Sequence, residues 1–299
     1  MDAVQEQSRA ATPAPARKAT KRGRGLGTWL RLIPLLIGAF VFLFPFYYMV
    51  VSALQKAPNP GISGAFPSPS SLSLSNFGAI NDAINLPRSL LNSALFTGGV
   101  LLGTLVFGML AGYALAQLHF RGRQPVFYLL LLLLVLPFQL LMIPLYVLIA
   151  RNFGLGDNLL GMILPFAINP TAVFIFRQFF LQLPRDMFDA ARIDGASEFA
   201  VLTQVVMPLT RPAILTALLI TFIGPWNEFL WPFLITKKLE LEPLAVALAN
   251  YISTVAQSTA NPYGTILAGA FVLAVPVVIL FLIFQRQFVE SAIGSGIKG

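Results

Sequence analysis

The chain has 299 residues, of which 57% are hydrophobic and only 11% charged, and its formal net charge is +8. A soluble domain usually carries about 25% charged residues, so this composition argues against a soluble protein. There is no cysteine and only one histidine, which excludes disulfides and thiolate metal sites and leaves little for a histidine-based metal or acid–base centre.

A basic arm comes first, at residues 1–31, with Ala, Pro, Thr, Lys and Arg but no apolar periodicity. We expect it to be disordered and solvated, with contact to anionic lipid as the alternative. Six later stretches are apolar over roughly the 20 residues that a membrane-crossing helix needs. The sequence therefore predicts an all-α integral membrane protein with six transmembrane helices, at or within residues 32–54, 89–118, 124–150, 159–180, 212–235 and 265–284.

Positive charge alternates along the connections between these helices. In membrane proteins, Lys and Arg are enriched in cytoplasmic loops, and we therefore do not interpret the net charge as nucleic-acid binding. The arm, the third and fifth connections and the C-terminal tail are the basic ones, with Arg121 and Arg123 in the third and Arg177, Arg185, Arg192 and Arg211 in the fifth. This pattern predicts that both termini and residues 181–211 face the cytoplasm.

The fifth predicted helix carries an acidic residue, Glu228, in the sequence GPWNEFLWP. An ionisable side chain inside a membrane is costly and is by default a functional candidate. The alternative is that Glu228 lies near a membrane interface, between Trp226 and Trp231, and is simply hydrated.

The connection at residues 181–211 is long for a loop, and its pattern predicts that it is folded. Pro184 suits the first turn of a helix, and Asp186 and Asp189 would lie near the positive N-terminal end of that helix. The pair Asp194-Gly195 would end the helix, because glycine tolerates the positive φ of a helix C-terminus.

A second short helix is predicted to follow this turn. Ser197 can cap it, and Pro208 and Pro212 would close it before the next membrane span. Its apolar face would be made of Phe199, Leu202, Val205 and Val206. An interfacial amphipathic helix, or a simple cover for the bundle, would not need small residues at Ala190 and Ala191, so we favour a docking element.

Several of these segments resemble one family, the bacterial ABC-importer permeases. Asp189-Ala190-Ala191-Arg192-Ile193-Asp194-Gly195-Ala196-Ser197, followed by Met207-Pro208-Leu209, resembles the family's EAA loop. Three other segments are similar to the family: Pro45-Phe46-Tyr47-Tyr48-Met49, Ile143-Pro144-Leu145-Tyr146 and Phe153-Gly154-Leu155. Residues 226–232 and the terminal Lys298-Gly299 are similar to its carbohydrate-uptake, maltose-permease-like branch. Two departures are Asp189 in place of the usual Glu, and Glu290-Ser291 where a glycine is common.

The resemblance implies a type I ABC-importer permease fold (MetI-like) spanning residues 32–299 in a bacterial cytoplasmic membrane. It also implies a separate cytoplasmic ABC ATPase dimer that holds ATP and Mg, a second and distinct homologous permease, and an extracytoplasmic solute-binding protein. No cofactor is expected on this chain, which has no G-x-x-x-x-G-K-[ST] phosphate loop. Docking to the ATPase would fall to Asp189, Ala190, Ala191, Asp194, Gly195 and Pro208.

The expected function is therefore transport, with a sugar or oligosaccharide as the solute. Aromatic faces stack on sugars and amides bond their hydroxyls, which makes Trp226, Asn227, Glu228 and Phe229 candidates for the substrate path. Three alternatives stay open: a stand-alone secondary transporter, an importer permease for glycerol phosphate or peptide, and a membrane enzyme. The enzyme is disfavoured because the acids near residue 190 fit helix ends and turns and have no histidine nearby.

Overall fold

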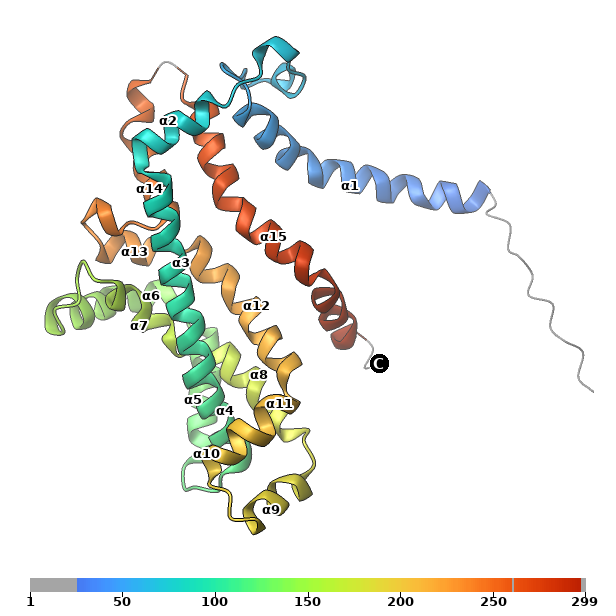
Figure 1. Cartoon of the computed structure of the whole chain (residues 1–299), viewed down its shortest axis with the longest axis vertical. Coiled ribbons are helices and arrows are strands. Elements are labelled where there is room, and N and C mark those ends of the chain that lie inside the picture. Colours follow the sequence, from blue (N-terminus) through green and yellow to red (C-terminus); the bar gives the residue numbers. More distant parts are fainter. Residues whose placement is uncertain (1–25, 260, 297–299) are drawn as a thin grey trace, which may run out of the picture. The chain divides into compact units, whose positions relative to one another are not determined.

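The computed structural model describes residues 26–259 and 261–296, and these residues form helices joined by short connections (Figure 1). The only β-type pairing among them is an isolated bridge between Gln55 and Leu72. The prediction of an all-α chain is confirmed for this part of the sequence. Of the basic arm predicted at residues 1–31, residues 1–25 lie outside the described part of the chain.

Two compact units divide the chain, residues 1–47 and residues 48–299. In the first, helix α1 (Leu26–Ala53) begins, six residues ahead of the predicted first span at residue 32, so residues 26–31 are helical. The boundary between the units lies inside α1, at Tyr47 and Tyr48.

The second unit contains the remaining helices. In chain order they are η1 (Ile62–Ala65), η2 (Pro69–Ser71), α2 (Ser75–Ile84), α3 (Leu86–Gly103), η3 (Thr104–Gly108), α4 (Met109–Gln117), α5 (Arg123–Val135), α6 (Phe138–Tyr146), η4 (Val147–Asn152), α7 (Leu159–Ala167), α8 (Pro170–Leu181), α9 (Arg185–Ile193), α10 (Glu198–Ala200), η5 (Val201–Val206), α11 (Met207–Leu209), α12 (Arg211–Asn227), α13 (Leu230–Ile235), η6 (Leu239–Leu241), α14 (Leu244–Ser253), η7 (Ala256–Ser258) and α15 (Tyr263–Gly296). The elements η3, η4 and η5 are π-helical, and the other η elements are 3₁₀ turns.

Three helices in the described part are long and apolar enough to cross a membrane: residues 32–53, 86–117 and 263–287. The count rises to six when each of three bent helix pairs is taken as one span, the third pair being Glu198–Leu209 with Arg211–Asn227. The predicted third span is such a pair, broken by 101° at Leu136-Pro137. Leu136 is extended there (φ −73°, ψ 122°), as expected for a residue that precedes proline.

The predicted fourth and fifth spans are also interrupted. The fourth bends by 43° between α7 and α8, where Asn169 caps α8 by accepting from the amides of Thr171 and Ala172 at 2.9 and 3.3 Å. The predicted fifth span, residues 212–235, is divided into α12 and α13 at Glu228 and Phe229.

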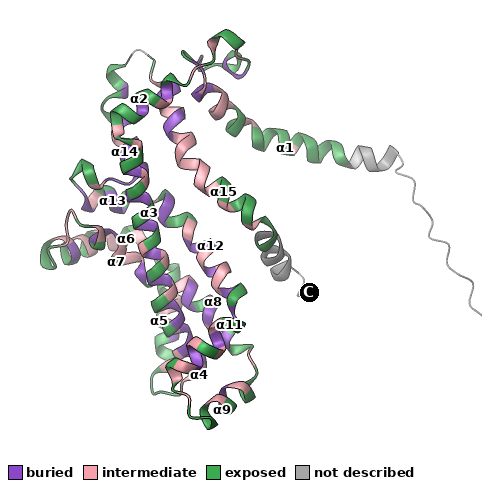
Figure 2. Cartoon of the chain, in the orientation of Figure 1, coloured by how far each residue is buried: buried purple, intermediate pink, exposed green. Residues whose placement is uncertain are grey.

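The core of the second unit lies along α3, α4 and α8, where the buried residues gather (Figure 2). Small residues bring these helices together, as is common between membrane helices. A Cβ on Gly112 of α4 would lie 2.7 Å from the Cβ of Phe176 on α8, and one on Gly103 would lie 2.9 Å from the Cβ of Ala167. The loop containing α9–α11 lies at one end of this unit, and α2 and α14 lie at the other (Figure 1).

Candidate functional site

Helix α9 has two faces of opposite character. Phe188 is its one buried residue, 2% exposed, and its ring lies 6.5 Å from that of Tyr113 on α4. On the opposite face, the exposed residues fall at helical spacing, at Asp186, Asp189, Ala190 and Ile193. Ile193 is 86% exposed. The helix therefore packs mainly through Phe188, with Ala191 partly buried beside it, and its mixed acidic and apolar stripe is exposed among the described residues.

A tight turn ends α9 in the way the sequence predicted. Gly195 has φ +83°, its amide donates to the carbonyl of Arg192, and the amide of Ala196 donates to the carbonyl of Ala191, each at 3.0 Å. This pair of bonds is the Schellman motif, which requires a left-handed residue and so favours glycine. A Cβ on Gly195 would meet nothing within 4 Å, so backbone conformation, not space, demands the glycine.

The second helical segment of the loop, Glu198–Leu209, confirms the cap but changes the predicted face. Ser197 accepts from the amide of Ala200 at 3.2 Å, as an N-cap residue does. The buried residues are Val201, Leu202 and Val206, whereas Phe199 is 68% exposed, so its predicted place in the apolar face was wrong. The π-helical turn at η5 explains the shift, because it breaks the 3.6-residue period on which that face was predicted.

A polar network joins the two halves of the loop to α4. Arg192 donates from Nε to Oε1 of Glu198 at 2.8 Å and from Nη2 to Oε2 at 3.3 Å. The hydroxyl of Tyr113 donates to the same Oε2. The hydrogen bond from Arg192 holds the pKa of the Glu198 carboxyl below its usual value, and the same bond raises the pKa of Arg192.

Asp189 also belongs to this network, at its edge. It accepts from Nη1 of Arg192 at 3.3 Å, and its side chain is 64% exposed. The predicted position near the N-terminal end of the helix was wrong for Asp189, because α9 begins at Arg185 and only Asp186 lies in its first turn. The carboxylate of Asp189 therefore meets no helix dipole end, and it orients Arg192 instead.

The loop leaves for α12 through a sharp bend. The segments Glu198–Leu209 and Arg211–Asn227 meet at 83°, with Thr210 between them. The Thr210 hydroxyl donates to the carbonyl of Val206 at 2.8 Å. Pro208 lies in the one-turn helix α11, and Pro212 occupies the first turn of α12, where a missing amide hydrogen costs nothing.

The four residues predicted for a substrate path surround the break between α12 and α13. Trp226 is 5% exposed and donates from its indole nitrogen to the carbonyl of Leu273 on α15 at 2.9 Å. Phe229 stacks on Phe233 with 5.2 Å between ring centroids. Trp226 is therefore a packing residue within this chain.

The polar members of that group lie at the break itself. The exposed Asn227 donates from its amide nitrogen to the carbonyl of Ile223 at 2.9 Å, and its amide oxygen accepts no hydrogen bond from the described residues. Glu228 is half-buried and accepts from the amide of Trp231 at 3.2 Å, which caps the start of α13. Trp231 is fully buried and bonds the carbonyl of Gly161 at 3.2 Å, so it does not form part of an exposed aromatic belt.

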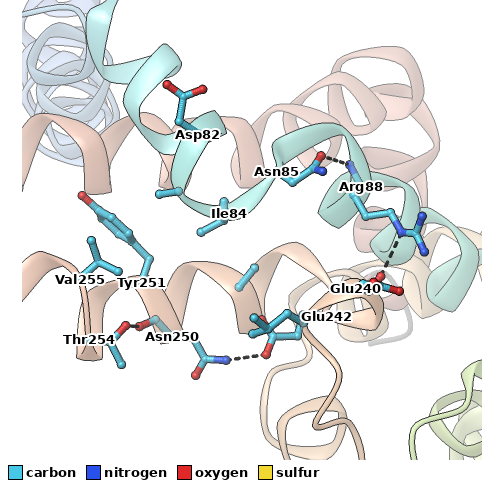
Figure 3. Close-up of a pocket in the computed structure, with 13 residues that line it drawn as sticks. Asp82, Ile84, Asn85, Arg88, Glu240, Glu242, Asn250, Tyr251, Thr254 and Val255 are labelled. Carbon is cyan, nitrogen blue, oxygen red and sulfur yellow. Dashed lines mark hydrogen bonds between the residues drawn. The ribbon is translucent and has the colours of Figure 1, made fainter.

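At the end of the unit away from the α9–α11 loop is a cavity of about 600 Å³ (Figure 3). Its walls come from α2, α3, η6 and α14. Hydrogen bonds from side chains to backbone carbonyls hold these elements together. Asn92 donates to the carbonyls of Glu240 and Glu242 at 2.8 and 3.1 Å, and Arg88 donates to the carbonyl of Glu240 at 3.0 Å. The lining is mixed: it includes the polar residues Asp82, Asn85, Arg88, Glu240, Glu242, Asn250, Tyr251 and Thr254 together with the apolar Ala83, Ile84, Leu239, Ala247 and Val255.

Glu242 is the buried acid of this cavity, at 6% exposed. Its Oε1 accepts from the amide nitrogen of Asn250 at 2.7 Å. Burial raises the pKa of its carboxyl, and the bond from Asn250 only partly opposes that effect. The guanidinium of Arg88 is in the same cavity but points to a backbone oxygen and not to this carboxylate (Figure 3).

Sequence reasoning missed Tyr113, which lies 85 positions before Glu198 in the chain. It also missed Arg123, which donates to the carbonyls of Leu115, Ala116 and Leu118 at the end of α4, at 2.8, 2.9 and 3.2 Å. A basic residue just past a helix end is a recognisable signal for the second of these. No local signal announces the first.

Comparison with known proteins places this geometry in a family. Residues 104–291, more than half of the chain, match the family model described as "Binding-protein-dependent transport system inner membrane component". The chain is 34% identical to the arabinooligosaccharides transport system permease protein AraQ of Halalkalibacterium halodurans, over 91% of this chain and 97% of that protein. It is 32% identical to the sn-glycerol-3-phosphate transport system permease protein UgpE of Yersinia pestis, over 91% and 98%.

A solved structure agrees on the fold. The match is to a bacterial ABC transporter involved in the import of the acidic polysaccharide alginate, with a TM-score of 0.76, 23% identity, and coverage of 89% of this chain and 98% of that one. The chain belongs to the binding-protein-dependent transport system inner membrane components, and it is a multi-pass permease subunit of an ABC importer, the transport component and not the catalytic one.

Proposed function

We propose that this permease couples to a separate ATPase through α9 and the Gly195 turn. The observation that carries the proposal is the exposed stripe of α9, with Asp189, Ala190 and the 86%-exposed Ile193, on a helix whose other face is fixed by Phe188. Small and apolar exposed residues permit close packing against a partner. Ala191, Asp194 and Pro208 support the shape of this surface and its exit.

The membrane orientation follows from charge. Arg177, Arg185, Arg192 and Arg211 lie in or beside the α9–α11 loop, and basic residues mark cytoplasmic loops. With that loop in the cytoplasm, both termini are cytoplasmic too, and the cavity lined by Glu242 lies on the extracytoplasmic side. ATP and Mg belong to the ATPase dimer, while a second permease and an extracytoplasmic binding protein complete the importer in its lipid membrane.

A saccharide is the proposed solute. Support comes from AraQ of Halalkalibacterium halodurans and from AraQ of Bacillus subtilis, to which the chain is 37% identical over 66% of its length. Irregular backbone at membrane depth is tolerated where it is buried in protein or lines a water-filled cavity. The break at Glu228 presents the free oxygen of Asn227 and a carboxylate, both suited to sugar hydroxyls.

Glycerol phosphate is the second candidate, favoured by the 32% identity to UgpE. The two candidates differ in charge, because a phosphate ester needs a cation or amide donors and Glu228 would repel it. Reconstituted with its ATPase and partner permease in liposomes, the protein should take up labelled arabinooligosaccharide with binding protein and ATP. If glycerol phosphate were taken up and the saccharide were not, glycerol phosphate would replace the saccharide as the proposed solute. Failure to associate with any ABC ATPase would refute the coupling proposal.

A further inference from the structure

We propose that Tyr113, Glu198 and Arg192 form a bridge that positions the α9 loop on α4 and carries its displacement into the membrane helices. The coupling part of this inference rests on the proposed docking of α9 to an ATPase. The positioning part concerns this chain alone and can be measured without any partner.

The bridge centres on one carboxylate that joins three helices. Glu198 begins α10, Arg192 lies in the last turn of α9, and Tyr113 lies on α4. Arg192 reaches both oxygens of Glu198, and the Tyr113 hydroxyl reaches Oε2. Two donors on one oxygen and a third on the other fix the carboxylate in position and orientation, which a single ion pair does not do.

Tyr113 anchors the bridge firmly in the bundle. It is 4% exposed, and its ring lies 6.3 Å from that of Phe180 on α8 and 6.5 Å from that of Phe188 on α9. Its helix, α4, cannot move independently of α8, because Gly112 already lies against Phe176 without a side chain of its own. A displacement of Glu198 is therefore transmitted to α4 and α8 together.

The loop needs such an anchor because little else holds α9. Phe188 is its one buried side chain, Ala191 and Ala196 are only partly buried against the same core, and a Cβ on Gly195 would meet nothing within 4 Å. Hydrogen bonds within the turn set the angle between α9 and α10 but do not attach either to α4. Without the bridge, α9 would pivot about Phe188 when a partner pulls on its exposed stripe.

An isolated exposed ion pair would not justify this role, since such pairs contribute little. The side chains of Arg192 and Glu198 are 35% and 43% exposed, so the pair alone belongs to that class. Tyr113 adds more than the ion pair, because its hydroxyl belongs to a buried side chain and loses its hydrogen-bond acceptor when Glu198 is changed. The position of the loop thus depends on Tyr113 more than on the ion pair.

The test of positioning uses the full chain in nanodiscs. The sequence has no cysteine, so spin labels can be placed at Ile193→Cys and Phe120→Cys, both exposed, with no background. Wild-type labels should give a narrow distance distribution, while Tyr113→Phe and Glu198→Gln should broaden it. Tyr128→Phe is the matched control, because it removes an exposed hydroxyl, bonded to Gln124, from α5. Equal widths in all four proteins would overturn the bridge.

The test of coupling uses the assembled importer in liposomes. Tyr113→Phe keeps the aromatic packing, so the ATPase should bind with unchanged affinity while solute moved per ATP falls by at least about tenfold, as expected for a lost hydrogen bond to a charged group. A parallel loss of assembly, hydrolysis and uptake would mean a merely structural role and would overturn the inference. A wild-type chain that binds no ATPase would instead defeat the proposed function, and the distance measurement would still decide the positioning.

Discussion

Two glutamates at opposite ends of the same helical unit carry opposite pKa shifts. Glu198, in the α9–α10 loop, has Arg192 beside it, and its pKa is lowered although its side chain is 43% exposed. Glu242, in the cavity at the other end, has only the amide of Asn250, and its pKa is raised by burial. A cationic partner within hydrogen-bond distance decides the sign, because it outweighs the cost of partial desolvation.

The two loops differ in construction as well. The cavity end is held by side chains that bond the backbone of η6, as Asn92 and Arg88 do. The α9–α10 loop is held by side chains that bond each other, around a glycine turn in open space. The first construction suits a fixed wall, and the second suits an element that transmits a displacement.

The largest expected effect comes from breaking the turn. Gly195→Val should lower solute uptake by at least about tenfold, because a β-branched residue at φ +83° is strained by roughly 1–2 kcal/mol and disrupts the Schellman turn. The chain should still reach the membrane, as checked by its yield there. Gly154→Val is the control, with φ +67° outside the loop, and it should transport. Normal uptake by Gly195→Val would remove the turn from the coupling surface.

The matching change at the other end should lower stability without uncoupling. Asn92→Ala leaves the carbonyl of the buried Glu242 without the Asn92 donor, at a cost of about 1–3 kcal/mol, whereas the carbonyl of Glu240 keeps its bond from Arg88. Thermal unfolding in detergent should show a lower midpoint than for the exposed Asn81→Ala. Transport per ATP should match wild type. A change in that ratio would mean that the cavity wall also takes part in coupling.

The third change tests the raised pKa. Because the folded-state pKa of Glu242 lies above its unfolded value, the stability it contributes is present below the unfolded pKa and falls as pH rises through the folded pKa. Glu242→Gln should therefore unfold at a higher temperature than wild type at neutral pH, with the difference vanishing in acid. The control Glu240→Gln, at an exposed position, should not show this pH-dependent difference in unfolding temperature. A less stable Glu242→Gln at neutral pH would contradict the shift.

The smallest expected effect is a change in stability at Glu198, whose pH dependence is opposite in sign to that of Glu242. The folded-state pKa of Glu198 is lowered, so its stabilisation is present above the unfolded pKa and is lost as pH falls through the folded pKa. Glu198→Gln should lower stability at neutral pH by about 0.2–1 kcal/mol, typical of exposed pairs, and the difference should shrink in acid. Thermal unfolding at several pH values measures it. A constant difference would mean that the ion pair is not its source.

Local features of the loop were predictable from the sequence, and long-range ones were not. Ser197 and Gly195 act within three residues of their own positions, and both were predicted correctly. Phe199 was misplaced because a π-helical turn follows it, and residue spacing cannot reveal such a turn. Tyr113 meets Glu198 only after α4 and α8 have packed, so its role depends on tertiary structure.

The membrane helices show the same division. Apolar length located the spans, but the break at Leu136-Pro137 was missed although proline favours an extended residue before it. Trp226 was a candidate for either a membrane belt or a substrate contact, and Trp231 for the belt. Both are buried, and each bonds a carbonyl of another helix. Tryptophan at a span end does not distinguish these environments, because its amphipathic ring suits all of them.

The most direct test of the account is cross-linking from the two ends of the second unit. Single cysteines at Ile193 and Leu239, which are 86% and 76% exposed, can carry the same short photo-reactive cross-linker in the assembled importer. The account predicts an adduct between residue 193 and the ATPase whose yield changes on ATP addition, and no ATPase adduct from residue 239. An ATPase adduct from residue 239 with none from residue 193 would contradict both the docking surface and the membrane orientation.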